Sequence, residues 1–96
     1  MKLSELLTAL EPVSFSGDSE REITAVAYDS RKVIPGSLFV CIRGEETDGH
    51  KYIPNAIQAG AAAIVAEEEP SFPLDAALIL VRDARSALAR ISAAWF

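Results

Sequence analysis

Hydrophobic residues at the start of the chain recur at helical spacing. Leu3, Leu6, Leu7 and Leu10 occupy the i, i+3, i+4 and i+7 positions of one helix face, which predicts an amphipathic helix over residues 3–10. Pro12 ends this helix, and residues 13–21, rich in Ser, Gly and Asp, have the composition of a loop. The chain is therefore expected to open with one short helix and a polar loop.

The next apolar runs have the length and composition of strands. Partial alternation over residues 23–28 and a nearly continuous apolar run over residues 38–42 predict two strands. The dipeptide Pro35-Gly36 between them suits a type II turn, because Pro fits the first central position and Gly the position with positive φ.

The second half of the chain alternates helical and strand patterns. A helix should begin between His50 and Ile53 and end at Gly60 in the left-handed conformation. Strands are expected over residues 62–66 and 77–81, separated by a loop in which Glu67-Glu68-Glu69 forms a solvated turn. Asp83 should cap a last helix whose apolar stripe consists of Ala84, Leu88, Ile91 and Trp95.

This order of elements predicts an α/β fold with a small mixed sheet of about four to five strands flanked by helices, a Rossmann-like arrangement. The connection through Pro35-Gly36 is too short for a parallel crossover helix, which is the reason for expecting a mixed sheet. With 96 residues, half of them hydrophobic, the chain can form one core, so residues 1–96 are interpreted as a single domain.

Charge and composition exclude several classes of protein. A net charge of −5 with scattered Lys and Arg argues against a nucleic-acid partner. No apolar run approaches the roughly 20 residues of a membrane span, and the N-terminus lacks the pattern of a signal peptide, so we expect no membrane partner and a cytoplasmic protein. Cys41 is expected to be a buried hydrophobe, and a lone His50 predicts no metal site.

Two polar segments follow directly after the first two predicted strands. Tyr28-Asp29-Ser30-Arg31 supplies an aromatic ring, an acceptor, a hydroxyl and a cation, and Arg43–His50 supplies two glycines, a threonine and further charges. Strand ends are where α/β folds keep their sites, and glycines let loop N–H groups approach a ligand. The sequence therefore predicts a site for a polar small molecule, with no catalytic residue assigned.

The same segments carry a family resemblance. The run from Asp29-Ser30-Arg31 through Pro35-Gly36 and Leu38-Phe39-Val40, followed by Thr47-Asp48-Gly49-His50, resembles the N-terminal domain of the Mur ligases, nearest to the MurE type. The resemblance covers residues from about 23 to 96. It implies the first domain of a bacterial, cytoplasmic, ATP-dependent ligase of peptidoglycan biosynthesis, which adds a diamino acid to UDP-MurNAc-L-Ala-D-Glu.

The resemblance also implies which residues hold the substrate. The N-terminal domain would bind the uridine nucleotide end of UDP-MurNAc-L-Ala-D-Glu through the residues Tyr28, Ser30, Glu45, Glu46 and Thr47. Supporting roles fall to Asp29, Arg31, Gly44, Asp48, Gly49 and His50. Arg31 would either add positive charge near the diphosphate or pair with Asp29 or Asp48, while Asp48 would cap a helix and His50 would brace the loop.

ATP has no predicted place on this chain. The sequence contains no Gly-Lys-Thr phosphate loop. The resemblance assigns ATP and Mg²⁺ to central and C-terminal domains absent from these residues, so the fragment alone is expected to be inactive. Two alternatives remain at this stage, namely the corresponding domain of a MurF-type ligase that adds D-Ala-D-Ala and a free-standing nucleotide-binding or interaction module.

Overall fold

The computed structural model describes residues 1–44, 47–71 and 74–95 of the chain. Its elements, in chain order, are α1 (Leu3–Leu10), β1 (Ser14–Ser16), β2 (Ala25–Ala27), the 3₁₀ helix η1 (Ser30–Lys32), β3 (Ser37–Val40), the 3₁₀ helix η2 (Gly49–Tyr52), α2 (Ile53–Gln58), β4 (Ala63–Ala66), β5 (Ala77–Leu80) and α3 (Ala84–Trp95). The predicted helices are confirmed, including the start of α2 between His50 and Ile53.

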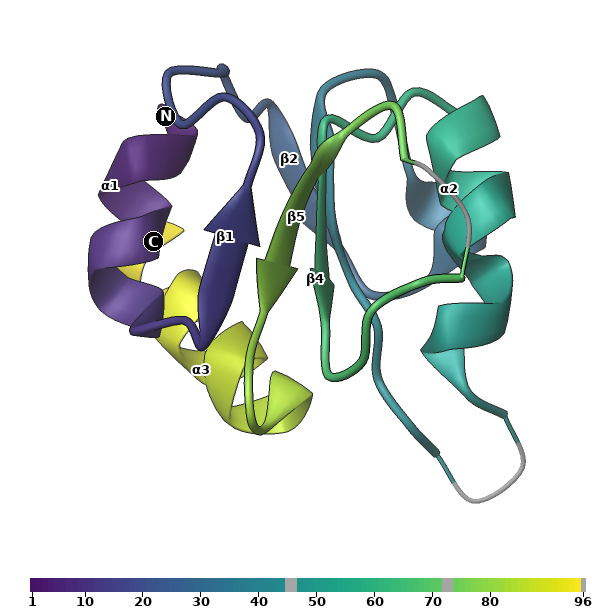
Figure 1. Cartoon of the computed structure of the whole chain (residues 1–96). Helices are drawn as coiled ribbons and strands as arrows, with labels where there is room; N and C mark the ends of the chain where they lie inside the picture. The colour runs from purple at the N-terminus through teal and green to yellow at the C-terminus, as the bar shows by residue number, and fades with distance from the viewer. Residues whose placement is uncertain (45–46, 72–73, 96) are drawn as a thin grey trace.

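The five strands form one sheet in the order β1-β5-β4-β3-β2. Strands β2 to β5 are parallel, whereas β1 runs antiparallel to β5. In Figure 1 the arrow of β1 points up and those of β4 and β5 point down. The predicted α/β class with a mixed sheet of four to five strands is confirmed, and the carboxyl ends of four strands meet at one edge.

Two expectations about the strands were wrong, including the reason given for a mixed sheet. Residues 13–21 do not form a loop throughout, because they contain β1, an edge strand with only Phe15 partly buried. The connection through Pro35-Gly36 does join parallel strands, because η1 and the turn take the place of a crossover helix between β2 and β3. The antiparallel strand is β1.

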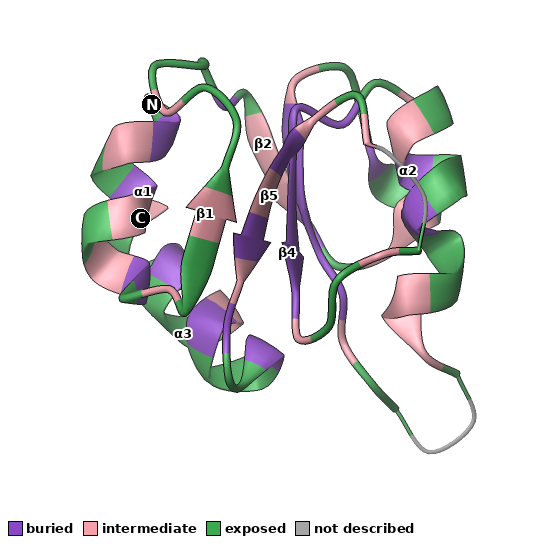
Figure 2. Ribbon diagram, in the orientation of Figure 1, coloured by how far each residue is buried: buried purple, intermediate pink, exposed green. Residues whose placement is uncertain are grey.

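Helices cover both faces of the sheet. Figure 1 shows α1 and α3 on one side and α2 on the other. Strand residues alternate between the two cores: Leu38 and Val40 belong to the cluster under α1 and α3, whereas Phe39 and Cys41 belong to the cluster under α2. Trp95 packs partly buried on the first cluster. Figure 2 shows the central strands β4 and β5 largely buried between these layers.

Two tight turns fix the connections that lead into and out of the α2 layer. Pro35-Gly36 forms the predicted turn, in which the Ser37 N–H donates to the Ile34 carbonyl at 3.0 Å and Gly36 has φ +87°. Gly60 ends α2 with φ +101°, and its carbonyl accepts the Gly36 N–H at 2.8 Å. A Cβ at Gly60 would lie 2.9 Å from Pro35 Cα, so the two turns pack directly on each other.

Among the described residues, no helix has the length and apolar character needed to cross a membrane.

Candidate functional site

A hollow of about 450 Å³ lies at the carboxyl ends of β2 and β3. Its lining consists of Tyr28, Asp29, Ser30, Arg31, Phe39, Ile42, Thr47, Gly49 and Tyr52. Both segments singled out in the sequence therefore contribute, because parallel neighbouring strands bring their ends to one edge of the sheet. Apolar side chains and hydroxyl groups share this lining, which is typical of small-molecule sites.

The first wall is the turn after β2. Asp29 caps η1 by accepting the Arg31 N–H at 3.0 Å, and its carboxylate also pairs with the Arg31 guanidinium through Nε at 3.1 Å and Nη2 at 2.8 Å. These side-chain and backbone hydrogen bonds from Arg31 lower the pKa of Asp29 to about 2. Of the two roles predicted for Arg31, pairing with Asp29 is the one that the geometry contains.

Tyr28 precedes that pair in sequence, and Ser30 lies between its two residues. The Tyr28 side chain is 65 % exposed, which is unusual for a large ring unless it has something to contact. Within the described ranges, no protein group is hydrogen-bonded to the Ser30 hydroxyl. The turn thus presents an aromatic face and a hydroxyl group to the hollow, while its charges neutralise each other.

The second wall is the loop after β3. It folds back on itself through a bridge between Arg43 and Asp48 and through the Gly44 N–H, which donates to the Thr47 carbonyl at 2.7 Å. The Gly49 N–H then donates to the Ile42 carbonyl at 2.8 Å. A Cβ on Gly49 would lie 2.7 Å from Ile42 N, so only glycine allows this close return.

Asp48 and His50 are not among the lining residues of the hollow, and they bind each other. Asp48 accepts the His50 N–H at 3.0 Å and lies 2.6 Å from ring Nδ1, while ring Nε2 accepts the Glu67 N–H at 3.0 Å. Because Nε2 acts as an acceptor, the proton of the neutral ring sits on Nδ1 and is donated to Asp48. Burial of Asp48 works against its ionisation, but the hydrogen bonds from His50 outweigh it, so the pKa of Asp48 lies below its usual range.

Glu67 extends this connection to the last helix. Its Oε2 accepts the Ala84 N–H at 2.8 Å, which satisfies a free donor in the first turn of α3, and its Oε1 lies 3.7 Å from Arg43 Nη1. Arg43 also pairs with Glu68 and lies 3.5 Å from Asp48 through Nε. We call the group Arg43, Asp48, His50, Glu67 and Glu68 the clamp, since it ties the ends of β3 and β4 to α3.

The clamp corrects one prediction from the sequence. Glu67-Glu68-Glu69 is not simply a solvated turn, since Glu67 is partly buried and both Glu67 and Glu68 pair with Arg43, whereas Glu69 is exposed. Glu67 directly follows the buried strand β4. Asp48 does cap η2 and His50 does brace the loop, as predicted.

The clamp does not suit a metal ion. Ligand atoms of Asp48, His50 and Glu68 lie within 4.8 Å of one another. Both ring nitrogens of His50 are already engaged, one as donor and one as acceptor, and the carboxylates pair with the Arg43 guanidinium. A metal needs deprotonated nitrogen and free carboxylate oxygens, so the donor set present does not fit one.

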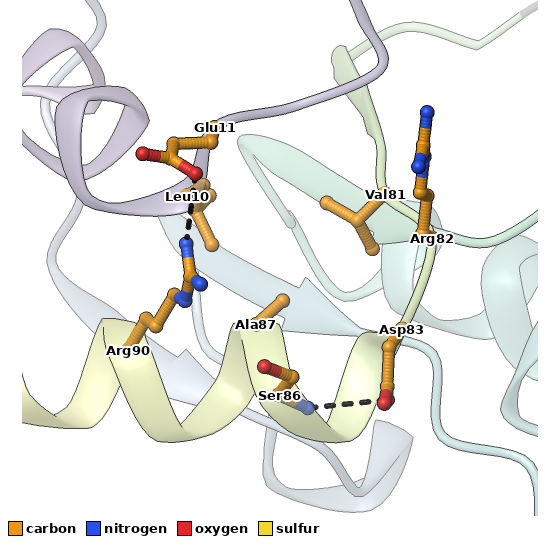
Figure 3. Close-up of a pocket in the computed structure, with 8 residues that line it drawn as sticks. All are labelled: Leu10, Glu11, Val81, Arg82, Asp83, Ser86, Ala87 and Arg90. Atoms are coloured by element: carbon orange, nitrogen blue, oxygen red, sulfur yellow. Dashed lines mark hydrogen bonds and ion pairs between the residues drawn. The ribbon is translucent and has the colours of Figure 1, made fainter.

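A second hollow of about 200 Å³ lies between α1 and α3. Figure 3 shows its lining of Leu10, Glu11, Val81, Arg82, Asp83, Ser86, Ala87 and Arg90. Its charged groups are largely engaged: Arg90 lies 3.4 Å from Glu11, and Asp83 caps α3, as predicted, by accepting the Arg85 and Ser86 N–H groups at 3.0 and 3.2 Å. None of the residues predicted to form the site lies here.

The predicted site residues fall into three groups. Tyr28, Asp29, Ser30, Arg31, Thr47 and Gly49 line the larger hollow. Gly44, Asp48 and His50 shape the adjoining loop without lining it, and Glu45 and Glu46 lie outside the described residues. The sequence interpretation missed Phe39, Ile42 and Tyr52 as lining residues, although Tyr52 ends the same 3₁₀ helix, η2, that Gly49 begins.

Cys41 has the predicted character. It is fully buried on the α2 side of β3, and burial, with the nearby carboxylates of Asp48 and Glu67, raises the pKa of its thiol to about 12. A thiol of this kind remains protonated and unreactive at neutral pH.

Similar sequences come from one class of ligase. A protein from Bacteroides thetaiotaomicron named UDP-N-acetylmuramoyl-L-alanyl-D-glutamate--2,6-diaminopimelate ligase is 47 % identical over 97 aligned residues, covering 100 % of this chain and 20 % of its own length. A ligase of the same name from Bacillus licheniformis is also 47 % identical with the same coverage. The chain thus spans about a fifth of the length of the curated relatives it matches.

Solved structures share the fold. MurF from Acinetobacter baumannii superimposes with a TM-score of 0.85 at 23 % identity, covering 97 % of this chain and 20 % of that one. MurF from Thermotoga maritima, solved in complex with ADP, has a TM-score of 0.63 at 30 % identity and covers 75 % of this chain and 16 % of that one. The family model described as Mur ligase family, catalytic domain, matches residues 22–96. On this match over most of its length, the chain belongs to the Mur ligase family.

Proposed function

We propose that this chain is the N-terminal, substrate-binding domain of a bacterial, cytoplasmic, ATP-dependent ligase that adds a diamino acid to UDP-MurNAc-L-Ala-D-Glu in peptidoglycan biosynthesis. In this proposal the domain holds the uridine nucleotide end of that substrate. The observation that carries it is the hollow at the ends of β2 and β3, lined by Tyr28, Ser30 and Thr47, in a chain of the Mur ligase family.

The lining suits a nucleoside. Ile42 offers partly exposed apolar surface, and Tyr28 offers a ring on which a planar base can stack. A uracil edge has two carbonyl acceptors and one N–H donor, which the hydroxyls of Ser30 and Thr47 and nearby backbone groups can satisfy. The hollow also has the size of sites that enclose small molecules, about 300 to 1,000 Å³.

ATP and Mg²⁺ belong elsewhere in this proposal. The chain has no glycine-rich phosphate loop, and the clamp does not suit a metal ion for the reasons given above. We therefore assign the transfer of phosphate and the formation of the amide to further domains of the full-length enzyme. No catalytic step is assigned to this chain.

A MurF-type ligase is the alternative. The similarity to Thermotoga maritima MurF, at 30 % identity over 75 % of this chain, favours it to a degree. The relatives that match over the whole chain at 47 % identity carry the name of the diaminopimelate-adding ligase, and this favours the first proposal. Activity of the full-length enzyme with a diamino acid or with D-Ala-D-Ala separates the two.

An NMR titration of the chain tests the docking role. We expect UDP-MurNAc-L-Ala-D-Glu and UDP to shift the amide signals of Tyr28 to Arg31 and of Thr47 to Gly49, and ATP at equal concentration to leave them unchanged. Shifts of equal size with ATP, or shifts centred on the hollow between α1 and α3, would contradict the proposal. An absence of shifts in both the isolated chain and the full-length enzyme would contradict it as well.

A matched pair of serine variants tests the position of the site. Ser30→Ala should weaken binding of UDP-MurNAc-L-Ala-D-Glu to the full-length enzyme about 2- to 13-fold, the equivalent of one hydrogen bond of about 0.5 to 1.5 kcal/mol. Ser14→Ala is the control, because Ser14 is exposed on the opposite edge strand of the sheet. Equal dissociation constants for both variants and the wild type would remove Ser30 from the site.

A further inference from the structure

Residues of the loop after β3 contribute both to the hollow and to the clamp. Thr47 and Gly49 line the hollow, whereas Asp48 and His50 point to the clamp. Asp48 lies between these two lining residues in sequence and has extended backbone angles. Whatever fixes Asp48 and His50 therefore also fixes the wall of the hollow.

His50 is the link between this wall and the rest of the edge. Its ring is mostly buried, with 11 % of the side chain exposed, and joins Asp48 on one side to the Glu67 N–H on the other. Glu67 in turn holds the first N–H of α3. Three hydrogen bonds thus connect the loop that borders the hollow to the start of α3.

We propose that His50 is a positioning residue for the ligand and acts in its neutral form, holding Thr47 and Gly49 in the wall of the hollow, so that protonation of His50 releases that wall. The inference rests on the proposed uridine nucleotide site. It adds that the affinity of this site for its ligand depends on pH. A protonated ring carries hydrogen on both nitrogens and cannot accept the Glu67 N–H, so the bond at 3.0 Å is lost.

Other ionisable groups surround the ring. Asp48 lies on the same loop as His50. The neighbouring elements contribute Arg43 and Cys41, which follow β3, and Glu67 and Glu68, which follow β4. From α3 comes Arg85, whose guanidinium donates to the Arg43 carbonyl at 3.1 Å. The Asp48 contact can persist in either form of the ring, since Nδ1 carries a proton in both. The bond to Glu67 is the one that responds to protonation.

The test measures the affinity for UDP-MurNAc-L-Ala-D-Glu from about pH 8 to about pH 5.5, a range in which the carboxylates of this ligand stay ionised. We expect the wild-type affinity to fall at least about fivefold from the upper to the lower end of this range. His50→Gln should show no such step, because an amide does not titrate and its carbonyl can accept the Glu67 N–H. Lys51→Gln, at the exposed next position, should keep the wild-type step.

A second readout needs no ligand and no variant. In the free wild-type chain the amide signals of Thr47, Gly49 and Glu67 should titrate with the same midpoint as the His50 ring, followed by NMR. A ring that titrates while these amides stay still would overturn the inference, as would a pH step that persists in His50→Gln. Coupled amides in a chain that binds no uridine ligand at any pH would support the positioning role and contradict the proposed function instead.

Discussion

The carboxyl edge of the sheet contains two polar regions, the hollow and the clamp, which differ in whether their polar side chains are already hydrogen-bonded to one another. Beyond β2 and β3, hydroxyls and aromatic rings line a hollow and keep unused hydrogen-bonding capacity. Beyond β4 and at the start of α3, the clamp uses its carboxylates, its guanidinium and both nitrogens of an imidazole on one another. Charge alone therefore does not mark a site. The region with fewer charges is the one in which we propose the ligand site.

The largest loss should come from the centre of the clamp. His50→Ala removes the acceptor of the Glu67 N–H and the donor to Asp48, and we expect it to lower the free energy of unfolding by about 1 to 3 kcal/mol. Urea denaturation followed by circular dichroism measures this, with Lys51→Ala as the exposed neighbouring control. A loss no larger than that of the control would show that the clamp contributes little to stability.

A smaller loss is expected from the carboxylate at the start of α3. Glu67→Ala leaves the Ala84 N–H without its acceptor, which is comparable to removing a helix cap and should cost about 0.5 to 2 kcal/mol. Glu69→Ala provides the matched control, because this residue of the same turn is exposed. The prediction fails if the two variants unfold at the same urea concentration.

The smallest effect concerns the charge pair within the wall of the hollow. Arg31→Gln should raise the pKa of Asp29 from about 2 toward the usual value near 3.9, because it removes the hydrogen bonds that favour the carboxylate. A depressed folded-state pKa contributes stability above about pH 3.9, and this contribution disappears as the pH falls through about 2. The pair is exposed, so its effect on stability is expected to be slight.

The ¹³C signal of the Asp29 carboxyl group reports this pKa directly. Lys32→Gln serves as the control, because the Lys32 side chain acts on the Asp29 carboxylate only through its charge, and the backbone hydrogen bond from the Lys32 N–H to the Asp29 carbonyl does not involve that side chain. An unchanged midpoint in Arg31→Gln would mean that the pair does not persist in solution.

The sequence predicted elements well wherever apolar spacing was decisive. The four leucines of α1 recur at helical spacing, and β3, β4 and β5 are nearly continuous apolar runs, because they pack against the cores. Strand β1 was missed because an edge strand paired with one neighbour can consist of exposed serines around a single Phe15. The parallel pairing of β2 with β3 depends on the combined path of η1 and the type II turn between them, which no local sequence pattern reveals.

The site was predictable in part for a similar reason. Tyr28 to Arg31, Thr47 and Gly49 follow strands directly, and strand order then brings them together. The clamp joins His50 to Glu67 across 17 positions of sequence, so its contacts arise only from the pairing of β3 with β4. A run of three glutamates looks equally polar throughout, and only the fold distinguishes Glu67 from Glu69.

The placement of the aromatic residues gives the molecule two separate optical probes. The single tryptophan, Trp95, packs against the core under α1 and α3, whereas both tyrosines, Tyr28 and Tyr52, line the hollow at the carboxyl ends of β2 and β3. Tryptophan fluorescence should therefore follow the docking of the first and last helices, and tyrosine absorbance should follow the occupancy of the hollow. The natural sequence thus allows the two events to be observed separately without any added label.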